Sequence, residues 1–163
     1  MCLSKGITGG FLPMGATLPN SRIFDAFGGD DPARAFWHGH SYTGNPLACA
    51  AALASLEIFR TEPVFERIAA IAQVHAERLP RLRRFEAVGD TRNIGTVGAV
   101  ELRVEDGGYL SSLRPKLYNF FLGKNILLRP LGNVVYILPP YCTPVSELHR
   151  VYDVIEEAIQ TLC

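Results

Sequence analysis

Lys5 is the residue of this chain best placed to do covalent chemistry. It lies between a short apolar segment and a glycine-rich turn, in the run Met1-Cys-Leu-Ser-Lys-Gly-Ile-Thr-Gly-Gly10. An amine held in this way at the edge of a sheet can form an imine with an aldehyde. The same ten residues also fit a solvated lysine after a short strand. Two later segments favour the first interpretation.

The first of these segments is a loop rich in histidine and hydroxyl side chains, Phe36-Trp-His-Gly-His-Ser-Tyr-Thr-Gly-Asn-Pro46, which leads into a predicted helix. Backbone N–H groups and the hydroxyls of residues 41–43 can hold an anion such as phosphate at a helix N-terminus. The pair His38 and His40 could ligate a metal ion, but two histidines without a third ligand at suitable spacing are weak evidence. We therefore predict no metal site.

The second segment places an arginine at the end of an apolar run, just before a proline. It reads Ile126-Leu-Leu-Arg-Pro-Leu-Gly-Asn-Val-Val-Tyr-Ile-Leu-Pro-Pro-Tyr141. The planar guanidinium of Arg129 suits bidentate binding of a carboxylate. Taken alone, this segment favours a surface arginine at a strand end.

Together, in this order and over almost the whole chain, the three segments resemble the class III branch of the fold-type-I, pyridoxal-phosphate-dependent aminotransferases. The run Ser4-Lys5-Gly6 with Thr8-Gly9-Gly10 is similar to the cofactor-lysine motif of that family. Residues 38–47 are similar to its phosphate-contacting loop and the start of the helix that follows, and residues 129–141 are most similar to one subfamily. The resemblance implies an α/β fold, the C-terminal part of a fold-type-I transferase: the end of the large domain plus the small α/β C-terminal domain.

The resemblance also implies how pyridoxal 5'-phosphate would be bound. Lys5 would hold the cofactor through an imine and move a proton between the substrate's α-carbon and the cofactor. Ser41 would bind the cofactor phosphate in the active site of the partner in a homodimer. His40 stands where many relatives carry proline, so only a backbone role carries over to it.

For the substrates, a small keto-acid and an amino donor, the resemblance implies three further residues. Gly39 would line the pocket by its backbone, Arg129 would pair with a substrate carboxylate, and Tyr136 would lie close by. Two alternatives remain open from the residues. One is a class III enzyme for ornithine, GABA or another ω-amino acid, and the other is a non-catalytic α/β module.

One departure from the family pattern is large. The family's aspartate for the pyridinium nitrogen, its ring-stacking aromatic and its main phosphate-binding segment all lie upstream of the lysine, and here only four residues precede Lys5. Asp25, Asp30 and Asp31 follow Lys5 and cannot inherit the aspartate's role. We therefore expect a C-terminal fragment that is inactive alone.

These residues must be positioned by an irregular N-terminal part and a periodic remainder. We expect residues 1–45 to be a remnant of the large cofactor-binding domain, 46–62 an interdomain helix buried on several sides, and 63–163 a small α/β domain with a short antiparallel sheet. Residues 1–4 should form a buried strand whose partner is absent from the sequence. The remaining predicted elements are helices from Pro63, over 110–122 with Gly123 as its stop and from Pro144, and strands over 95–104, 125–129 and 134–138.

Composition excludes several function classes. The 163 residues carry 16 basic and 16 acidic side chains and no basic stripe, so nucleic acid is not an expected partner. There is no apolar run of the ~20 residues that span a membrane and no signal-peptide pattern, so we expect no membrane partner and a cytoplasmic location. The cysteines, Cys2, Cys49, Cys142 and Cys163, are too scattered for a disulfide framework or zinc site, and we expect Cys2 and Cys49 to be buried thiols.

Overall fold

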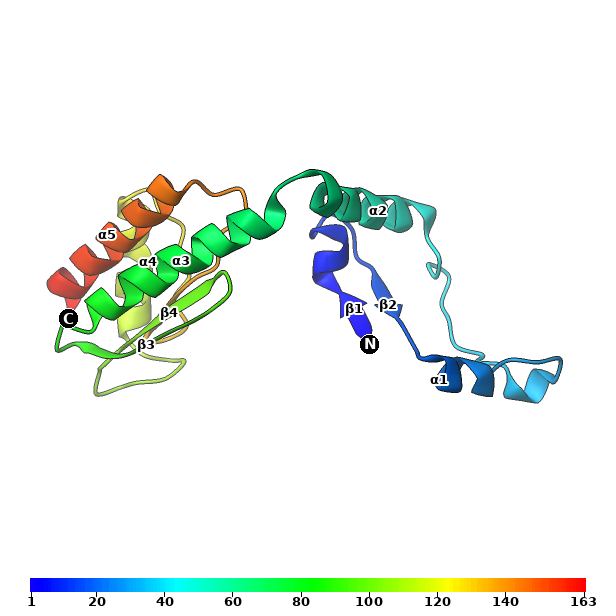
Figure 1. Cartoon of the computed structure of the whole chain (residues 1–163). Helices are drawn as coiled ribbons and strands as arrows, with labels where there is room; N and C mark the ends of the chain where they lie inside the picture. The colour runs from blue at the N-terminus through cyan, green and yellow to red at the C-terminus, as the bar shows by residue number, and fades with distance from the viewer. The chain divides into compact units, whose positions relative to one another are not determined.

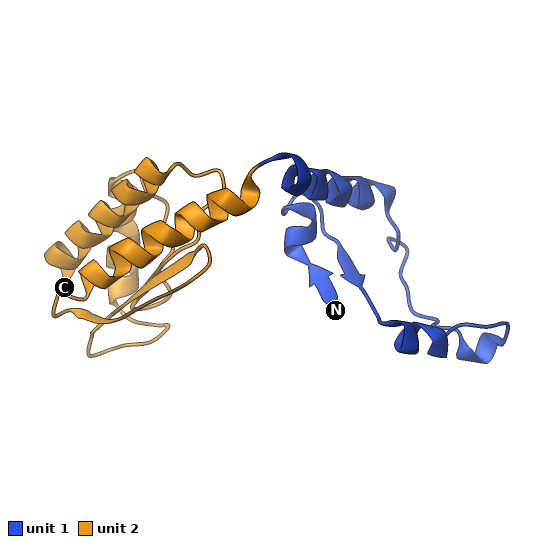
Figure 2. Cartoon of the chain, in the orientation of Figure 1, with its two compact units in different colours: residues 1–62 blue, residues 63–163 orange.

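The computed structural model describes residues 1–163, which divide into two compact units, Met1–Glu62 and Pro63–Cys163 (Figure 2). Each unit contains its own antiparallel sheet, two-stranded in the first and three-stranded in the second (Figure 1). None of the helices is both long and apolar enough to cross a lipid bilayer.

The first unit begins with a small hairpin. Strand β1 (Cys2–Ser4) pairs with β2 (Gly15–Thr17), and the 3-10 turn η1 (Lys5–Thr8) lies between them. The expectation that the first strand is buried and has no partner in the chain is wrong, as is the expectation of a buried thiol at Cys2, which is exposed. A strand of three residues pairs through its backbone, so Gly15-Ala-Thr17 can supply it without an apolar pattern in the sequence.

Helix α2 (Pro46–Thr61) starts where the sequence predicts it. The Asn45 side chain accepts a hydrogen bond from Leu47 N at 2.9 Å, and Pro46 occupies the first helical position. Within the chain, however, only the small residues Ala48 and Ala52 of this helix are buried. The expectation of burial on several sides is therefore not met. Its large apolar residues Leu47, Leu53, Leu56 and Ile58 are exposed.

Two short elements of the first unit lie in the stretch expected to be irregular. Helix α1 (Ser21–Ala26) is capped by Asn20, whose side chain accepts from Ile23 N, and η2 (Pro32–Arg34) is capped by Asp31. Both are one or two turns long and carry no buried residue, so no apolar periodicity in the sequence predicts them.

The second unit is a three-stranded sheet packed against helices, in the order α3 (Val64–Leu82), β3 (Val88–Ile94), β4 (Val97–Leu102), α4 (Leu113–Gly123), β5 (Val134–Ile137) and α5 (Val145–Leu162). The strand order is β3-β4-β5, with every pair antiparallel. Helix α3 packs against β3, β4 and α5, and α4 packs against α5. The core side chains that are fully inaccessible to solvent are Val100, Leu117, Phe121, Tyr152 and Ile155.

The sheet differs from prediction in two places. The strand β3 was not predicted, because it is mostly polar and only Val88 and Thr91 are buried in it. Residues 125–129, predicted as a strand, make no strand pairing. Helix α4 includes Gly123 and is closed instead by Asn125, which has φ +58° and is followed by a bond from Ile126 N to Phe121 O of 2.9 Å.

A buried polar contact joins α3, α5 and the β3–β4 turn. His75 is fully buried, with Nε2 3.0 Å from Thr96 O and Nδ1 2.6 Å from the Tyr152 hydroxyl. Because a carbonyl oxygen can only accept, Nε2 carries the proton and the Tyr152 hydroxyl donates to Nδ1. A Cβ on Gly98 would lie 2.9 Å from both His75 Nδ1 and the Tyr152 oxygen, so β4 requires glycine at that position.

Candidate active site

Lys5 has an unusual backbone conformation. Its φ of +50° lies in the left-handed region, where residues other than glycine, asparagine and aspartate are uncommon, and only Asn125 shares this property among non-glycine residues. The side chain is exposed at the wall of a cleft of about 1040 Å³ within the first unit. Backbone outliers of this kind cluster at functional sites, which makes Lys5 the first candidate there.

The loop that precedes α2 lines the same cleft. His40 N donates to Thr43 Oγ1 at 3.0 Å, and Tyr42 N donates to His40 Nδ1 at 3.1 Å, so the loop folds on its own side chains. Further in, Asn45 caps α2, and Ala48 and Cys49 of its first turn also border the cleft. The start of α2, the end of the helix whose dipole favours an anion, therefore borders the same cleft as the Lys5 amine.

The predicted cofactor residues are brought together only in part. Lys5 and His40 both line the cleft, whereas Ser41 does not, and its side chain is exposed. Gly39, predicted to line the substrate pocket, is also absent from the cleft. The cleft also includes Gly10 of the lysine motif and the segment 12–15, which no sequence motif indicates. They reach it because β2 turns back along β1, and the sequence carries no signal for that pairing.

Arg129 and Tyr136 belong to the second unit, so the cleft contains neither. Arg129 is exposed, and its guanidinium makes no hydrogen bond or ion pair within the chain. Tyr136 is half-buried on β5, opposite Ala99 of β4. The guanidinium of Arg129 is thus available to a ligand.

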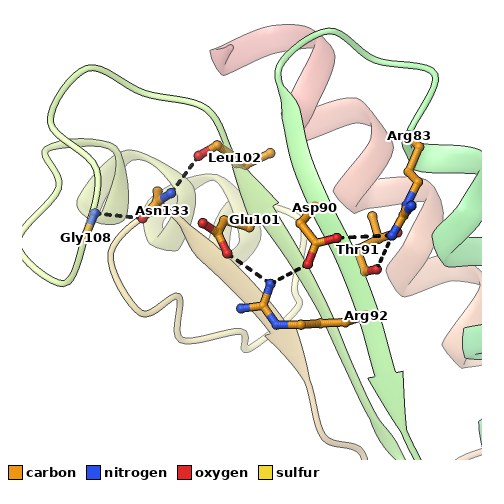
Figure 3. A network of polar contacts seen from close by, with 8 residues as sticks. All are labelled: Arg83, Asp90, Thr91, Arg92, Glu101, Leu102, Gly108 and Asn133. Carbon is orange, nitrogen blue, oxygen red and sulfur yellow. Dashed lines mark hydrogen bonds and ion pairs between the residues drawn. The ribbon is translucent and has the colours of Figure 1, made fainter.

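The backbone that follows Arg129 is held firmly. The carbonyl of Pro130 accepts a hydrogen bond from Arg114 Nε at 3.2 Å. Figure 3 shows how the next turn is fixed: Asn133 Nδ2 donates to Leu102 O at 2.6 Å, and Gly108 N donates to Asn133 Oδ1 at 2.9 Å. Asn133 is only 8% exposed, so both bonds are shielded from water.

A second polar cluster in Figure 3 links the strands β3 and β4. Arg92 Nη1 lies 3.0 Å from both Asp90 Oδ2 and Glu101 Oε2, and Arg83 reaches Asp90 from the end of α3. The hydrogen bond from Arg92 lowers the pKa of Asp90 below its ordinary value. All these side chains are well exposed, so the cluster positions the hairpin and forms no enclosed site.

Comparison with known proteins identifies the family. The sequence profile of the family described as aminotransferase class-III matches residues 1–159. This chain belongs to the class III aminotransferases. The expected fold, an α/β part of a fold-type-I transaminase, is confirmed by solved transaminase structures that match 98–99% of this chain.

Several named relatives are similar along the whole chain. Over 162 residues the chain is 40% identical to the adenosylmethionine-8-amino-7-oxononanoate aminotransferase of Synechococcus elongatus, a match that covers 99% of this chain and 38% of the relative. The enzyme of the same name from Aquifex aeolicus is 39% identical, with 99% and 37% covered. This chain therefore spans somewhat more than a third of the length of these relatives.

Two solved structures illustrate the match in three dimensions. The adenosylmethionine-8-amino-7-oxononanoate aminotransferase of Methanocaldococcus jannaschii has a TM-score of 0.89 at 38% identity, covering 99% of this chain and 38% of that one. An amine transaminase from an uncultivated Pseudomonas species, in its PLP-bound internal aldimine form, has a TM-score of 0.81 at 32% identity, with the same coverage.

Proposed function

We propose that this chain is the lysine-bearing part of a pyridoxal-phosphate-dependent aminotransferase, in which Lys5 holds the cofactor. The observation that carries the proposal is the left-handed Lys5 at a cleft shared with the loop before α2. The cleft suits this cofactor because it offers an amine for its aldehyde and a helix start for its phosphate. His40 would contribute through its backbone, and Ser41 would bind the phosphate in the active site of a second copy of the enzyme.

The chemistry divides between cofactor and protein. When bound, pyridoxal phosphate accepts the electron pair that a broken C–H bond leaves on the substrate. Lys5 Nζ would take the proton from that carbon and deliver it to the cofactor. This is general acid–base catalysis by a positioned amine. Because the Lys5 amine is exposed at the cleft, it can both hold the cofactor and move the proton.

We propose 8-amino-7-oxononanoate as the amino acceptor, with adenosylmethionine as donor and 7,8-diaminononanoate as product, a step in biotin synthesis. The support is that relatives carrying this substrate in their names are 37–40% identical to the chain. The omega-aminotransferase of Caulobacter vibrioides, at 30% identity over 161 residues, keeps an ω-amino acid substrate as the alternative. Comparing turnover of 8-amino-7-oxononanoate with that of ω-amino acids in an active enzyme containing this segment would separate the two.

Arg129 is the residue that we assign to the substrate's carboxylate, with Tyr136 beside the substrate and Gly39 lining the pocket by its backbone. An arginine without an internal partner is suited to this, because its charge-assisted fork is not already satisfied. Residues 1–45, 46–62 and 63–163 would then be the large-domain remnant, the interdomain helix and the small domain. We also propose a homodimeric, cytoplasmic enzyme.

The isolated chain should not catalyse transamination. Its relatives are more than twice as long, and no carboxylate of the Lys5 cleft can hold the pyridine nitrogen protonated, since the cleft lining includes no Asp or Glu. We propose that this group comes from sequence outside the 163 residues.

Reductive trapping tests the assignment of Lys5. Pyridoxal phosphate is added to the chain, the mixture is reduced with borohydride, and the modified peptides are mapped by mass spectrometry. Lys5 should be modified in preference to the other two lysines, Lys116 and Lys124, which serve as internal controls. Equal modification of the three lysines, or preference for another one, would refute the assignment.

A further inference from the structure

We propose that Thr8 is a positioning residue that holds Lys5 in its left-handed conformation at the cleft. The proposal rests on the proposed function for its meaning, but its structural part concerns only the chain itself. Thr8 is the last residue of η1, the turn that Lys5 opens, and it is 3% exposed in a unit where few side chains are buried.

The Thr8 hydroxyl joins the two ends of the turn. Its Oγ1 lies 2.5 Å from Leu12 O and 3.4 Å from Lys5 O. A hydroxyl has one proton, so it donates mainly to the nearer carbonyl of Leu12, with the carbonyl of Lys5 as a second, weaker acceptor. Both Lys5 and Leu12 line the cleft, and Thr8 thus ties one part of its wall to another.

The backbone around Thr8 closes the same turn. Gly9 N donates to Gly6 O at 3.0 Å and Phe11 N donates to Thr8 O at 3.1 Å. Gly9 and Gly10 both have positive φ, at +61° and +79°, which glycine adopts without steric cost. Lys5 does not share that freedom, so its φ of +50° must be imposed by surrounding contacts, and the Thr8 hydroxyl is the side chain that reaches its carbonyl.

Burial of Thr8 connects this turn to the candidate phosphate loop. The turn η1 packs against α2, which begins at Pro46 directly after the His40 loop and its cap Asn45. A shift of Thr8 would therefore move the Lys5 amine relative to the start of α2. The proposed cofactor carries its aldehyde and its phosphate on one molecule, with Lys5 at the first and the start of α2 at the second. Such a shift would therefore misplace the amine relative to the aldehyde.

The experiment compares Thr8→Val, which keeps the shape but removes the hydroxyl, with Thr8→Ser, which keeps the hydroxyl. The first readout is the backbone conformation of Lys5 in the 163-residue chain, measured by NMR from its HN–Hα coupling and Cα and Cβ chemical shifts. We expect a left-handed backbone at Lys5 in the unsubstituted chain and in Thr8→Ser. In Thr8→Val we expect Lys5 to lose this conformation. Amide signals of α2 report whether the unit remains folded.

The second readout is the ratio of borohydride-trapped pyridoxal phosphate on Lys5 to that on Lys116 and Lys124. Loss of one buried hydrogen bond should lower this ratio by about five- to tenfold in Thr8→Val, with recovery in Thr8→Ser. In a Lys5→Gly background, Thr8→Val should leave the conformation of residue 5 unchanged, because glycine adopts positive φ without help.

The outcomes separate this proposal from the proposed function. If Lys5 is not the preferred lysine in the original chain, the proposed function fails, and the NMR comparison still decides the role of Thr8. If Thr8→Val changes neither the Lys5 conformation nor the trapping ratio, or if Thr8→Ser behaves like Thr8→Val while α2 remains folded, Thr8 is not a positioning residue.

Discussion

The two units of this chain are built by different means. The second unit has an enclosed apolar core, in which side chains from three helices and three strands meet. In the first unit, the buried residues are Thr8, Ala48 and Ala52, and large apolar side chains such as Phe11, Trp37 and Leu53 are 68–83% exposed. The first unit is therefore held mainly by turns, caps and a short hairpin, while the second is held by side-chain packing.

This difference matters because the candidate cofactor chemistry lies in the first unit and the candidate carboxylate ligand in the second. The Lys5 cleft is formed by loops and a helix start, whereas Arg129 extends from a backbone fixed by Arg114 and Asn133. Exposed apolar side chains at this density are typical of surfaces that other protein segments cover. The large apolar side chains of the first unit thus lack cover within the chain, whereas the core of the second unit is enclosed by its own side chains.

Hydrogen exchange tests the comparison most directly. We expect amides of residues 1–45 to exchange quickly, because few apolar contacts resist their opening, and those of residues 96–160 to exchange slowly, at or near the rate of global unfolding. Exchange measured by mass spectrometry on the 163-residue chain would reveal this. Uniform protection along the chain would show that both units are equally stable and that the comparison is wrong.

Phe121→Ala should have the largest effect among single substitutions. The side chain is fully buried in the core of the second unit, so its truncation should reduce the free energy of unfolding by roughly 3–5 kcal/mol. Urea unfolding followed by circular dichroism measures this loss. The matched control is Phe11→Ala in the first unit, where the ring is 82% exposed and the change should be small.

Arg129→Ala should raise the KM for the keto-acid by roughly ten- to a hundredfold in an active enzyme containing this chain, since a charge-assisted contact is worth about 1.5–3 kcal/mol. Arg129→Lys should recover only part of the loss, because the fork geometry is missing. Steady-state kinetics measure both. An unchanged KM in Arg129→Ala would make Arg129 an ordinary surface residue.

Acidification should weaken the second unit through His75. Burial lowers the pKa of His75 below its ordinary value of 6.5, and the bond to Thr96 O opposes this only in part. Below pH 6.5 the unfolded chain therefore binds a proton that the folded chain does not. The free energy of unfolding should decrease as the pH is lowered, and should level off below the folded-state pKa. Urea unfolding between pH 7.5 and 5 should show this fall, and His75→Gln should lack it, since glutamine does not titrate there.

Asn45→Ala should have the smallest effect on stability of these substitutions, and the effect should be confined to the first unit. The lost cap on Leu47 N should destabilise the start of α2 by about 1 kcal/mol, because one helix N–H loses its acceptor. Faster amide exchange in residues 47–49 would report it, with Asn45→Asp as the control that keeps an acceptor. The second unit should be unaffected, so a parallel change in α3 would contradict the division into two units.

The elements predicted correctly are those whose signals are local. Pro46 after Asn45 marks the start of α2, and apolar residues at helical spacing mark α3 and α5. The mostly polar strand β3 and the hairpin partner β2 were missed because each is defined by its pairing with another segment. For the same reason, Lys5, His40 and Arg129 could be proposed as functional residues from their motifs, while the 12–15 segment of the cleft could not.

The sequence by itself determined the family, the lysine and arginine that carry the proposed chemistry, and the helices, because side-chain type and short-range spacing suffice for these. Only the tertiary structure decided that Lys5 is left-handed, that Thr8 is buried, and that the His40 loop shares the Lys5 cleft. It also decided the order β3-β4-β5 and the burial of His75 against Tyr152. These features depend on contacts between residues distant in the sequence, and no local pattern encodes which distant partner will be met.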